Sequence, residues 1–483
     1  MSKKRFSDEA NMHYRYPNSD MLLNNTDALL KMIIHHRDEQ VPRLKTLEEY
    51  YLSNNTTILE EERRKEEHHA DHRASHPFAA FISNFIKGYM MGKPLKTTYP
   101  ENDDIEQFIQ DINILNDADA HNSELALNQS IFGRAYELLY RTDDTHFVEI
   151  DPKEAFVIYD DTVESNPIAA VRYLKSVVDD NLINVYFYTD KKVYHFQAKE
   201  TFDKLTLVKE TEHFFGGVPI IEYENNKYRQ GDFEKVLDQI DLYDSAQSDT
   251  ANYMTDLNDA MLKIVGSVEL DVEEAQKQKE ANIILLKPDL LENGNQGNVD
   301  ADYIYKKYDV AGTEAYKDRT FNDILMFTNT PNLLDSNFSG TQSGEAMKYK
   351  LFGLEQDRAS KERSFKKSLR ERYRLINNVS SFASEGEFDV SKIEITFMQN
   401  LPKDIKNEMD WFVRAGGELS NETMLSQLTF IENVKDEIKK LEEEKPQRMV
   451  INEMYNFPEG DINEDEKRKE LEGMEGNEET ERE

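Results

Sequence analysis

The period of the apolar residues changes along this chain, and the change limits the folds that it can adopt. Between about residues 134 and 223 the period is two, so that Val185 and Phe187 would face one side of a strand and Tyr186 and Tyr188 the other. Paired glycines and a proline at residues 214–223 mark a turn into a final edge strand. On either side the period is helical. We therefore predict an antiparallel sheet within a mainly helical α+β fold.

Helical patterns precede the sheet. Residues 1–75 have a helical and strongly charged pattern, and a further helix is predicted around residues 118–132. Between them, residues 76–94 place five large apolar residues on one helical face before Gly92 and Pro94 stop the helix. These five are Phe78, Phe81, Ile82, Phe85 and Tyr89.

A long helical pattern follows the sheet, from Asp232 to about Val265. At about 1.5 Å per residue such a helix would be about 50 Å long. Gln247 and Thr250 interrupt its apolar stripe in the middle. We therefore expect a rod that packs beside copies of itself rather than the core helix of a compact domain.

A polar loop lies between two further helices. Residues 267–310 have β character, and a helix is predicted from about Thr313 to Phe327. The segment 328–343 is then rich in Asn, Ser, Thr and Gly, and a very long helix should run from Glu345 to about Phe382. Long loops of this kind in folded proteins are usually functional or disordered.

The C-terminal part is predicted to be less regular. A strand at residues 393–397 is followed by a helical region, in which Ser420 is a plausible N-cap and residues 436–444 form a charged helix. Residues 459–483 are acidic and nearly free of large apolar groups, so we expect them to be disordered.

Net charge restricts the function. The chain has 95 acidic and 59 basic residues, a formal net charge of -36. Such a surface repels phosphates and argues against a tight DNA or RNA binder. An acidic wall still suits a conduit in which DNA must slide without adhering.

Several classes of site are not expected. The chain has no cysteine, which excludes disulfides and thiolate sites. It also has no apolar run long enough to span a membrane or to form the core of a signal peptide. We therefore expect a soluble protein that is made in the cytoplasm. His68, His69 and His72 have metal-ligand spacing, but they lie in a charged helix without a second cluster. No phosphate-binding loop or nucleophile elbow is found. We expect no enzyme, no cofactor and no metal site.

The order of several short motifs resembles the portal proteins of tailed bacteriophages, of the type found in long-tailed phages of Gram-positive hosts. Each motif is weak alone, and their order and spacing over about residues 75–445 carry the resemblance. They are Pro77-Phe-Ala-Ala-Phe-Ile with Gly88-Tyr-Met-Met-Gly-Lys-Pro, Phe132-Gly-Arg-Ala-Tyr-Glu, Asp151-Pro-Lys-Glu-Ala-Phe, Gly217-Val-Pro-Ile-Ile, Ser343-Gly-Glu-Ala-Met-Lys-Tyr-Lys, and Ile395-Thr-Phe-Met-Gln-Asn-Leu-Pro-Lys-Asp.

The resemblance implies a portal fold that assembles as a ring, typically of twelve copies, around an axial channel at one capsid vertex. The family architecture would divide the chain into wing, stem, clip, tunnel loop and crown. The implied divisions are wing 1–231 and 344–400, stem helices 232–265 and 313–327, clip 266–312, tunnel loop 328–343, crown 401–458 and acidic tail 459–483.

The resemblance also implies partners and site residues. The partners would be the terminase large subunit, capsid and scaffolding proteins, head-tail connector proteins and, transiently and without sequence preference, double-stranded DNA. An acidic clip face for the terminase would comprise Glu269, Asp271, Glu273 and Glu274. DNA contacts in and after the tunnel loop would come from Asn329, Asn332, Asn337, Ser339, Thr341, Gln342, Lys348 and Lys350. The two lysines could equally be solvated helix residues.

Two questions stay open at this point. The basic part of the long helix, Arg358 to Arg374, could contact DNA or pair with acidic groups of a neighbouring subunit. The whole chain could instead be an acidic helical scaffold that never meets DNA, or a DNA-processing enzyme of unfamiliar type. If the purified protein forms a closed ring, the portal interpretation is favoured over the scaffold interpretation. Metal-dependent DNA cleavage would support the enzyme interpretation.

Overall fold

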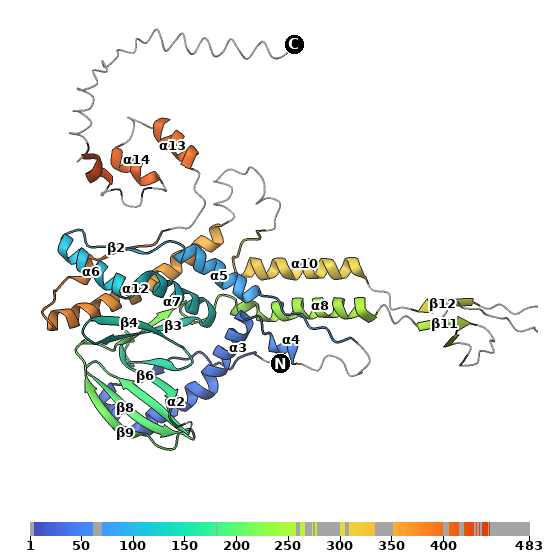
Figure 1. Cartoon of the computed structure of the whole chain (residues 1–483), viewed down its shortest axis with the longest axis horizontal. Coiled ribbons are helices and arrows are strands. Elements are labelled where there is room, and N and C mark those ends of the chain that lie inside the picture. The colour runs from blue at the N-terminus through green and yellow to red at the C-terminus, as the bar shows by residue number, and fades with distance from the viewer. Residues whose placement is uncertain are drawn as a thin grey trace, which may run out of the picture. The chain divides into compact units, whose positions relative to one another are not determined.

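The computed structural model divides the chain into two units, Met1–Asn400 and Leu401–Glu483, which are considered separately below. Figure 1 shows the elements of both units. The structure describes residues 4–60, 70–179, 181–256, 261–265, 273, 276–277, 300–304, 309–333, 351–398, 405–414, 420–428, 431, 434, 437–442 and 444. In these residues no helix has the length and apolar character needed to cross a membrane.

The predicted sheet region folds into two sheets. Six strands have the order β1-β5-β6-β7-β8-β9, and three have the order β10-β3-β4. All neighbours are antiparallel except β1, which pairs in parallel with β5. The strands are β1 Tyr14–Arg15, β3 Arg134–Arg141, β4 Thr145–Ile150, β5 Ala155–Tyr159, β6 Pro167–Lys175, β7 Leu182–Tyr188, β8 Lys192–Lys199, β9 Thr206–Glu212 and β10 Ile220–Glu224.

The alternation predicted for β7 is confirmed, and both faces of the strand pack against apolar groups. Val185 and Phe187 lie in a cluster with Leu29 and Ile33, because helices α1 (Ser19–Asn24) and α2 (Thr26–His35) cover that face. Tyr186 and Tyr188 point to the other face, where Tyr188 packs with residues of β3 and β10. β10 lies at the edge of the three-stranded sheet, as predicted.

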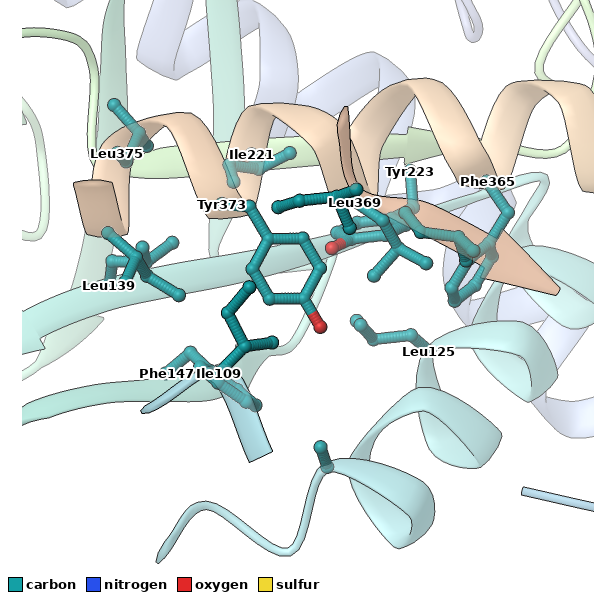
Figure 2. Packing of buried hydrophobic residues seen from close by; sticks show 14 of the residues in the cluster. Ile109, Leu125, Leu139, Phe147, Ile221, Tyr223, Phe365, Leu369, Tyr373 and Leu375 are labelled. Atoms are coloured by element: carbon teal, nitrogen blue, oxygen red, sulfur yellow. The ribbon is translucent and has the colours of Figure 1, made fainter. Parts of the chain in front are cut away.

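A second core lies under the long helix α12 (Phe352–Phe382). Phe365, Leu369 and Tyr373 of α12 enter it from one side, and Ile109 and Leu125 enter from the facing side (Figure 2). The other elements around this core include α5 Phe78–Met91, α6 Asp103–Leu115, α7 Ala118–Phe132, and β2 Lys96–Thr98 paired with β13 Glu394–Thr396. Helix α3 (Val41–Tyr51) packs against α5 and α7 and is followed by the short helix α4 (Thr56–Leu59). The predicted helices at 76–91 and 118–132 and the predicted strand near 393–397 are confirmed. The helix predicted from Glu345 to Phe382 is confirmed from Phe352 onwards, with Leu351 as its N-cap; residues 345–350 lie outside the described residues.

The long helix predicted from Asp232 to Val265 is wrong at its second half. A short 3-10 turn, Glu234–Val236, leads into α8 (Leu237–Asp256), but Met261–Val265 forms strand β11, paired antiparallel with β12 (Asp300–Ile304). A short apolar run ending in β-branched residues fits a strand as well as a helix, and only its distant partner decides between them. The second predicted helix is confirmed as α10 (Val310–Phe327) and begins three residues earlier than expected.

The second unit contains α13 (Ile405–Arg414) and α14 (Asn421–Gln427). Ser420 is the N-cap of α14, as predicted, and its Oγ accepts from the backbone N–H of Thr423 at 3.2 Å. The described positions among residues 436–444 are helical. The acidic tail predicted at 459–483 lies outside the described residues.

Candidate functional site

The candidate site is the pair of helices α8 and α10, called here the arm, together with the base of the loop that follows α10. The two helices run side by side (Figure 1). In mid-arm the buried ammonium of Lys317 donates to Gln247 Oε1 at 3.0 Å and pairs with Glu314 at 2.6 Å. Gln247 interrupts the apolar stripe of α8 because it faces this polar contact between the helices.

The root of the arm is apolar, in contrast to its middle. Phe78 at the start of α5 packs edge-on against Tyr243 of α8, with ring centroids 5.0 Å apart, and it lies 5.9 Å from Phe321 of α10. Ile240 and Ile324 are also buried there. The arm is therefore seated on the body by aromatic and aliphatic contacts.

A column of polar side chains on α8 holds an extended segment, residues 70–77, called here the strap. Asp244, Ser248 and Asn252 are all buried, at four-residue intervals. Their side chains accept from the backbone N–H groups of His76 at 3.1 Å, Ala74 at 2.9 Å and His72 at 2.5 Å. The amide of Asn252 also donates to the His72 carbonyl at 3.2 Å.

The spacing of the strap matches that of the helix. Four residues of helix rise about 6 Å, and two residues of extended chain span about 6.6 Å, so alternate N–H groups of the strap meet successive turns of α8. Asp244 also binds the His76 ring at 2.7 Å and accepts from Asn55 at 2.9 Å. These contacts satisfy backbone groups that no strand partner would reach.

Ion pairs fix the chain just before α8. The buried guanidinium of Arg43 pairs with Glu234 at 2.5 Å, and it also donates to the Phe132 carbonyl. Lys361 of α12 pairs with Asp232 at 2.7 Å. The direction in which α8 leaves the body is thus set by contacts to α3 and to α12.

The arm is acidic. α8 contains five aspartates and neither lysine nor arginine. Asp241 and Asp244 face the body, where Arg5, Tyr50 and Asn55 bind them, but Asp238 and Asp249 are exposed. The solvent-facing side of α8 therefore repels phosphate rather than binding it.

The loop that follows α10 starts from a well-defined helix end. Asn329 has a left-handed backbone, with φ 52°, and the N–H groups of Asn329 and Thr330 donate to the carbonyls of Met326 and Leu325. The Asn329 amide donates to Asp357 of α12 at 2.8 Å, and its oxygen lies where a Cβ on Gly353 would stand. Both ends of the loop are thereby held together by one side chain.

The sequence-predicted site residues are only partly within the described residues. Asn329 closes the loop base, so its amide is already engaged, and Asn332 is half-buried. Glu273 is exposed. The others lie outside the described residues: Asn337, Ser339, Thr341, Gln342, Lys348, Lys350, Glu269, Asp271 and Glu274.

Of the three histidines with metal-ligand spacing, the structure describes His72 alone. His68 and His69 lie outside the described residues, and the ring of His72 contacts Thr255 Oγ1 at 2.8 Å. No group of metal-ligating side chains occurs within the part of the chain that the structure describes.

Sequence reasoning missed the polar column. Asp244, Ser248 and Asn252 recur every four residues in a helix whose apolar stripe also holds three- and four-residue steps. The four-residue spacing of these polar residues, beside the apolar stripe, was the signal available in the sequence. It does not identify the strap that the polar column binds, because the strap lies far away in the sequence.

Comparison with known proteins gives consistent matches. The family model for "Phage portal protein, SPP1 Gp6-like" matches residues 30–450. The portal protein of Clostridium phage phiCD119 is 24% identical over 412 residues, covering 80% of this chain and 88% of the relative. The portal protein of Bacillus phage SPP1 is 23% identical over 402 residues, covering 78% and 77%.

Two solved structures also match this chain, at lower similarity. They are the neck of an empty GTA particle computed with C6 symmetry and the neck of a native GTA particle computed with C12 symmetry. Both are 13% identical to this chain, with TM-scores of 0.42 and 0.41. The matches cover 72% and 73% of this chain and 88% and 90% of those chains.

Proposed function

The chain belongs to the SPP1 Gp6-like family of phage portal proteins, and from this premise we propose that its copies close into a ring of twelve around an axial channel at one capsid vertex. The viral genome enters and leaves the capsid through this channel. As a portal protein the chain is a component of the phage particle. Assembly takes place in the host cytoplasm.

The arm carries this proposal. Its root is buried against the body and fixed by Arg43 and Lys361, and α8 itself carries five aspartates and no basic residue. A helix pair of this kind, repeated around an axis, would line a passage whose wall repels phosphates. DNA could slide along such a wall without adhering.

The divisions of the chain follow from this arrangement, with one revision to the sequence-based bounds. The first stem helix is α8 and ends at Asp256, and the β11–β12 pair belongs with the clip. α10 is the second stem helix, residues 328–343 form the tunnel loop, and unit Leu401–Glu483 contains the crown.

The tunnel loop would make moving contacts with DNA. Asn332, Asn337, Ser339, Thr341 and Gln342 can donate to phosphate without a fixed charge, and Lys348 and Lys350 could add transient ionic contacts. Asn329 instead holds the loop base closed through Asp357.

The clip would be the docking face for the terminase large subunit. Its acidic residues Glu269, Asp271, Glu273 and Glu274 would meet basic groups of that motor, which supplies the energy for packaging. The wing and the far end of the ring would contact capsid, scaffolding and head-tail connector proteins.

Deletion of residues 333–340 tests the function. Rings should still form, because Asn329 and the ends of α10 and α12 are untouched, while packaging of DNA into proheads should fall. A control deletion of residues 176–179, in the exposed turn between β6 and β7, should leave packaging unchanged. If the loop deletion packages DNA normally, the loop does not act on the genome; if rings are lost, it is structural.

A further inference from the structure

Helix α12 has a basic face on which four of the five cations have no carboxylate partner among the described residues, although Lys366 lies over the Phe397 ring at 5.3 Å. The face comprises exposed or half-exposed cations at helical spacing, ending beside a stacked pair of exposed phenylalanines with ring centroids 4.0 Å apart. Its members are Arg363, Lys366, Lys367, Arg370, Arg374, Phe214 and Phe382. Among the described residues only Arg374 of these cations forms an ion pair, with Glu371 at 2.5 Å.

Three other cations of the same helix form ion pairs. Arg358 pairs with Glu355, Lys361 with Asp232, and Arg372 with Glu137. In a chain with a net charge of -36, a carboxylate is easily available to any exposed cation. A row of four cations without one is therefore unusual, and it marks a surface that attracts an acidic partner.

Helix α6 carries a face of the opposite sign. Asp103, Asp104 and Asp111 are exposed, as are Asp117 and Asp119 just beyond the helix end. None of the five forms an ion pair within the described part of the chain. This acidic face also ends beside two exposed apolar residues, Ile114 at 71% and Leu115 at 48% exposure.

The two faces lie on different sides of the body. α12 and α6 both turn apolar residues into the same core, Phe365 from α12 and Ile109 from α6 (Figure 2). Since each helix points its apolar side at this core, each exposed side points away from it. The faces cannot pair within one copy, but a face on one copy can meet the other face on the next copy.

We infer that the basic face of α12 docks on the acidic face of α6 of an adjacent copy in the ring. The inference rests on the proposed function, because a contact between two different surfaces of one chain is heterologous and generates a closed ring when its rotation closes. The charges would fix the register, and Phe214 with Phe382 would bury apolar surface with Ile114 and Leu115.

DNA is the competing occupant of the basic face. Two features favour protein: the exposed aromatic pair beside the cations, which a phosphate backbone would not cover, and the presence on the same chain of an acidic face with its own apolar pair. DNA binding by the basic face is accordingly one of the outcomes tested below.

Charge reversal tests the contact in the full-length chain. Arg363→Glu, Lys367→Glu and Arg370→Glu together should raise the protein concentration at which rings dissociate at least tenfold. Asp103→Lys, Asp104→Lys and Asp111→Lys together should do the same, and combining both sets should restore the wild-type value. As a control of equal charge change, Lys199→Glu, Lys204→Glu and Lys209→Glu, at exposed positions of β8, β9 and the connection between them, should leave ring stability unchanged.

Cross-linking gives a second readout that does not depend on the stability of a variant. Because the chain has no cysteine, Gln107→Cys and Lys367→Cys in one chain introduce the only two thiols. Oxidation should yield covalent multimers up to the closed ring, whereas either single variant should give none beyond a dimer.

The outcomes separate the two proposals. If the wild-type chain forms no ring, the proposed function fails. If rings form but the reversals neither weaken nor rescue them and no cross-linked ladder appears, the interface is wrong while the function stands. If the α12 reversal leaves rings intact and lowers DNA retention, the basic face binds DNA instead.

Discussion

The body and the arm of this chain use their polar groups in opposite ways. The body buries charged pairs: Arg372 lies against Glu137 at 2.6 Å with both side chains fully buried, and Arg229 pairs with Glu222 at 2.6 Å. The arm instead buries side chains that accept hydrogen bonds from the backbone of the strap, such as Ser248, and leaves Asp238 and Asp249 exposed. A lost partner in the body strands a charge in the core, whereas a lost partner in the arm opens one local contact.

This difference suits a subunit that must hold a fixed frame around a passage. The buried charges of the body connect β3 to α12 and β10 to the segment that leads into α8, so they resist movement of the elements that carry the arm. The arm can then present an acidic α8 surface without contributing much to folding. Three substitutions and a change of pH test this contrast.

The largest effect is expected from Arg372→Met. The substitution strands Glu137, which also binds His121 at 2.7 Å and accepts from Tyr223 at 2.9 Å, in a fully buried site. We expect the free energy of unfolding to fall by about 3–5 kcal/mol, measured by chemical denaturation. Lys209→Met, at an exposed position of β9, should change it by less than about 0.5 kcal/mol. Equal effects of the two would remove the contrast.

Acid should weaken the body before the arm. Burial alone would raise the pKa of Glu222, but the charge of Arg229 and its hydrogen bonds lower this pKa to about 2. The ordinary value is 4.5, so this group's stabilisation is complete above pH 4.5 and is lost as the pH falls towards 2, a loss of up to about 3 kcal/mol. Hydrogen exchange across this range should report loosening of β10. Glu222→Gln should flatten that dependence, and an unchanged profile would contradict the assignment.

A smaller, local effect is expected from Ser248→Ala. The change leaves the backbone N–H of Ala74 without its partner, which costs about 1–2 kcal/mol. The loss should appear as faster hydrogen exchange of the strap at residues 72–76, with little change in the exchange of the sheets. Leu242→Ala, on the exposed side of α8, should leave the strap protected. Global unfolding in the Ser248 variant would show that the arm is part of the body's cooperative unit.

The smallest effect is expected from Asn329→Gly. Glycine keeps the left-handed backbone at the end of α10 but removes the hydrogen bond to Asp357, so stability should change by less than about 1 kcal/mol. Asn329→Val is the matched variant, because a β-branched residue is strained at this φ, and it should cost more. Thermal denaturation of the pair separates the backbone role from the side-chain role. Equal losses would mean that the contact with Asp357 dominates.

Local patterns predicted much of the fold, and they failed where distant segments decide. The alternation at Val185 and Phe187 identified β7, and the apolar spacing from Phe78 to Tyr89 identified α5. The same reasoning extended α8 through Met261, because the pairing of β11 with β12, some forty residues later, is invisible in a local period. The parallel pairing of the two-residue β1 with β5 was missed for the same reason.

The site was predicted less well than the fold. The basic residues of α12 stood out in the sequence, but only the structure separates Arg372, buried against Glu137, from Arg370, which is exposed. Asn329 was expected to face DNA, and the structure gives its amide a partner on α12. Polar residue types predict that a hydrogen bond will form, but not which partner will accept it.

The measurement that tests the account most directly is the mass and shape of the purified, full-length chain. Native mass spectrometry should give a species of twelve times 56.4 kDa, and negative-stain images of the same sample should show rings with a central opening. A compact single copy or dimer without an opening, at concentrations where portal rings should persist, would contradict it.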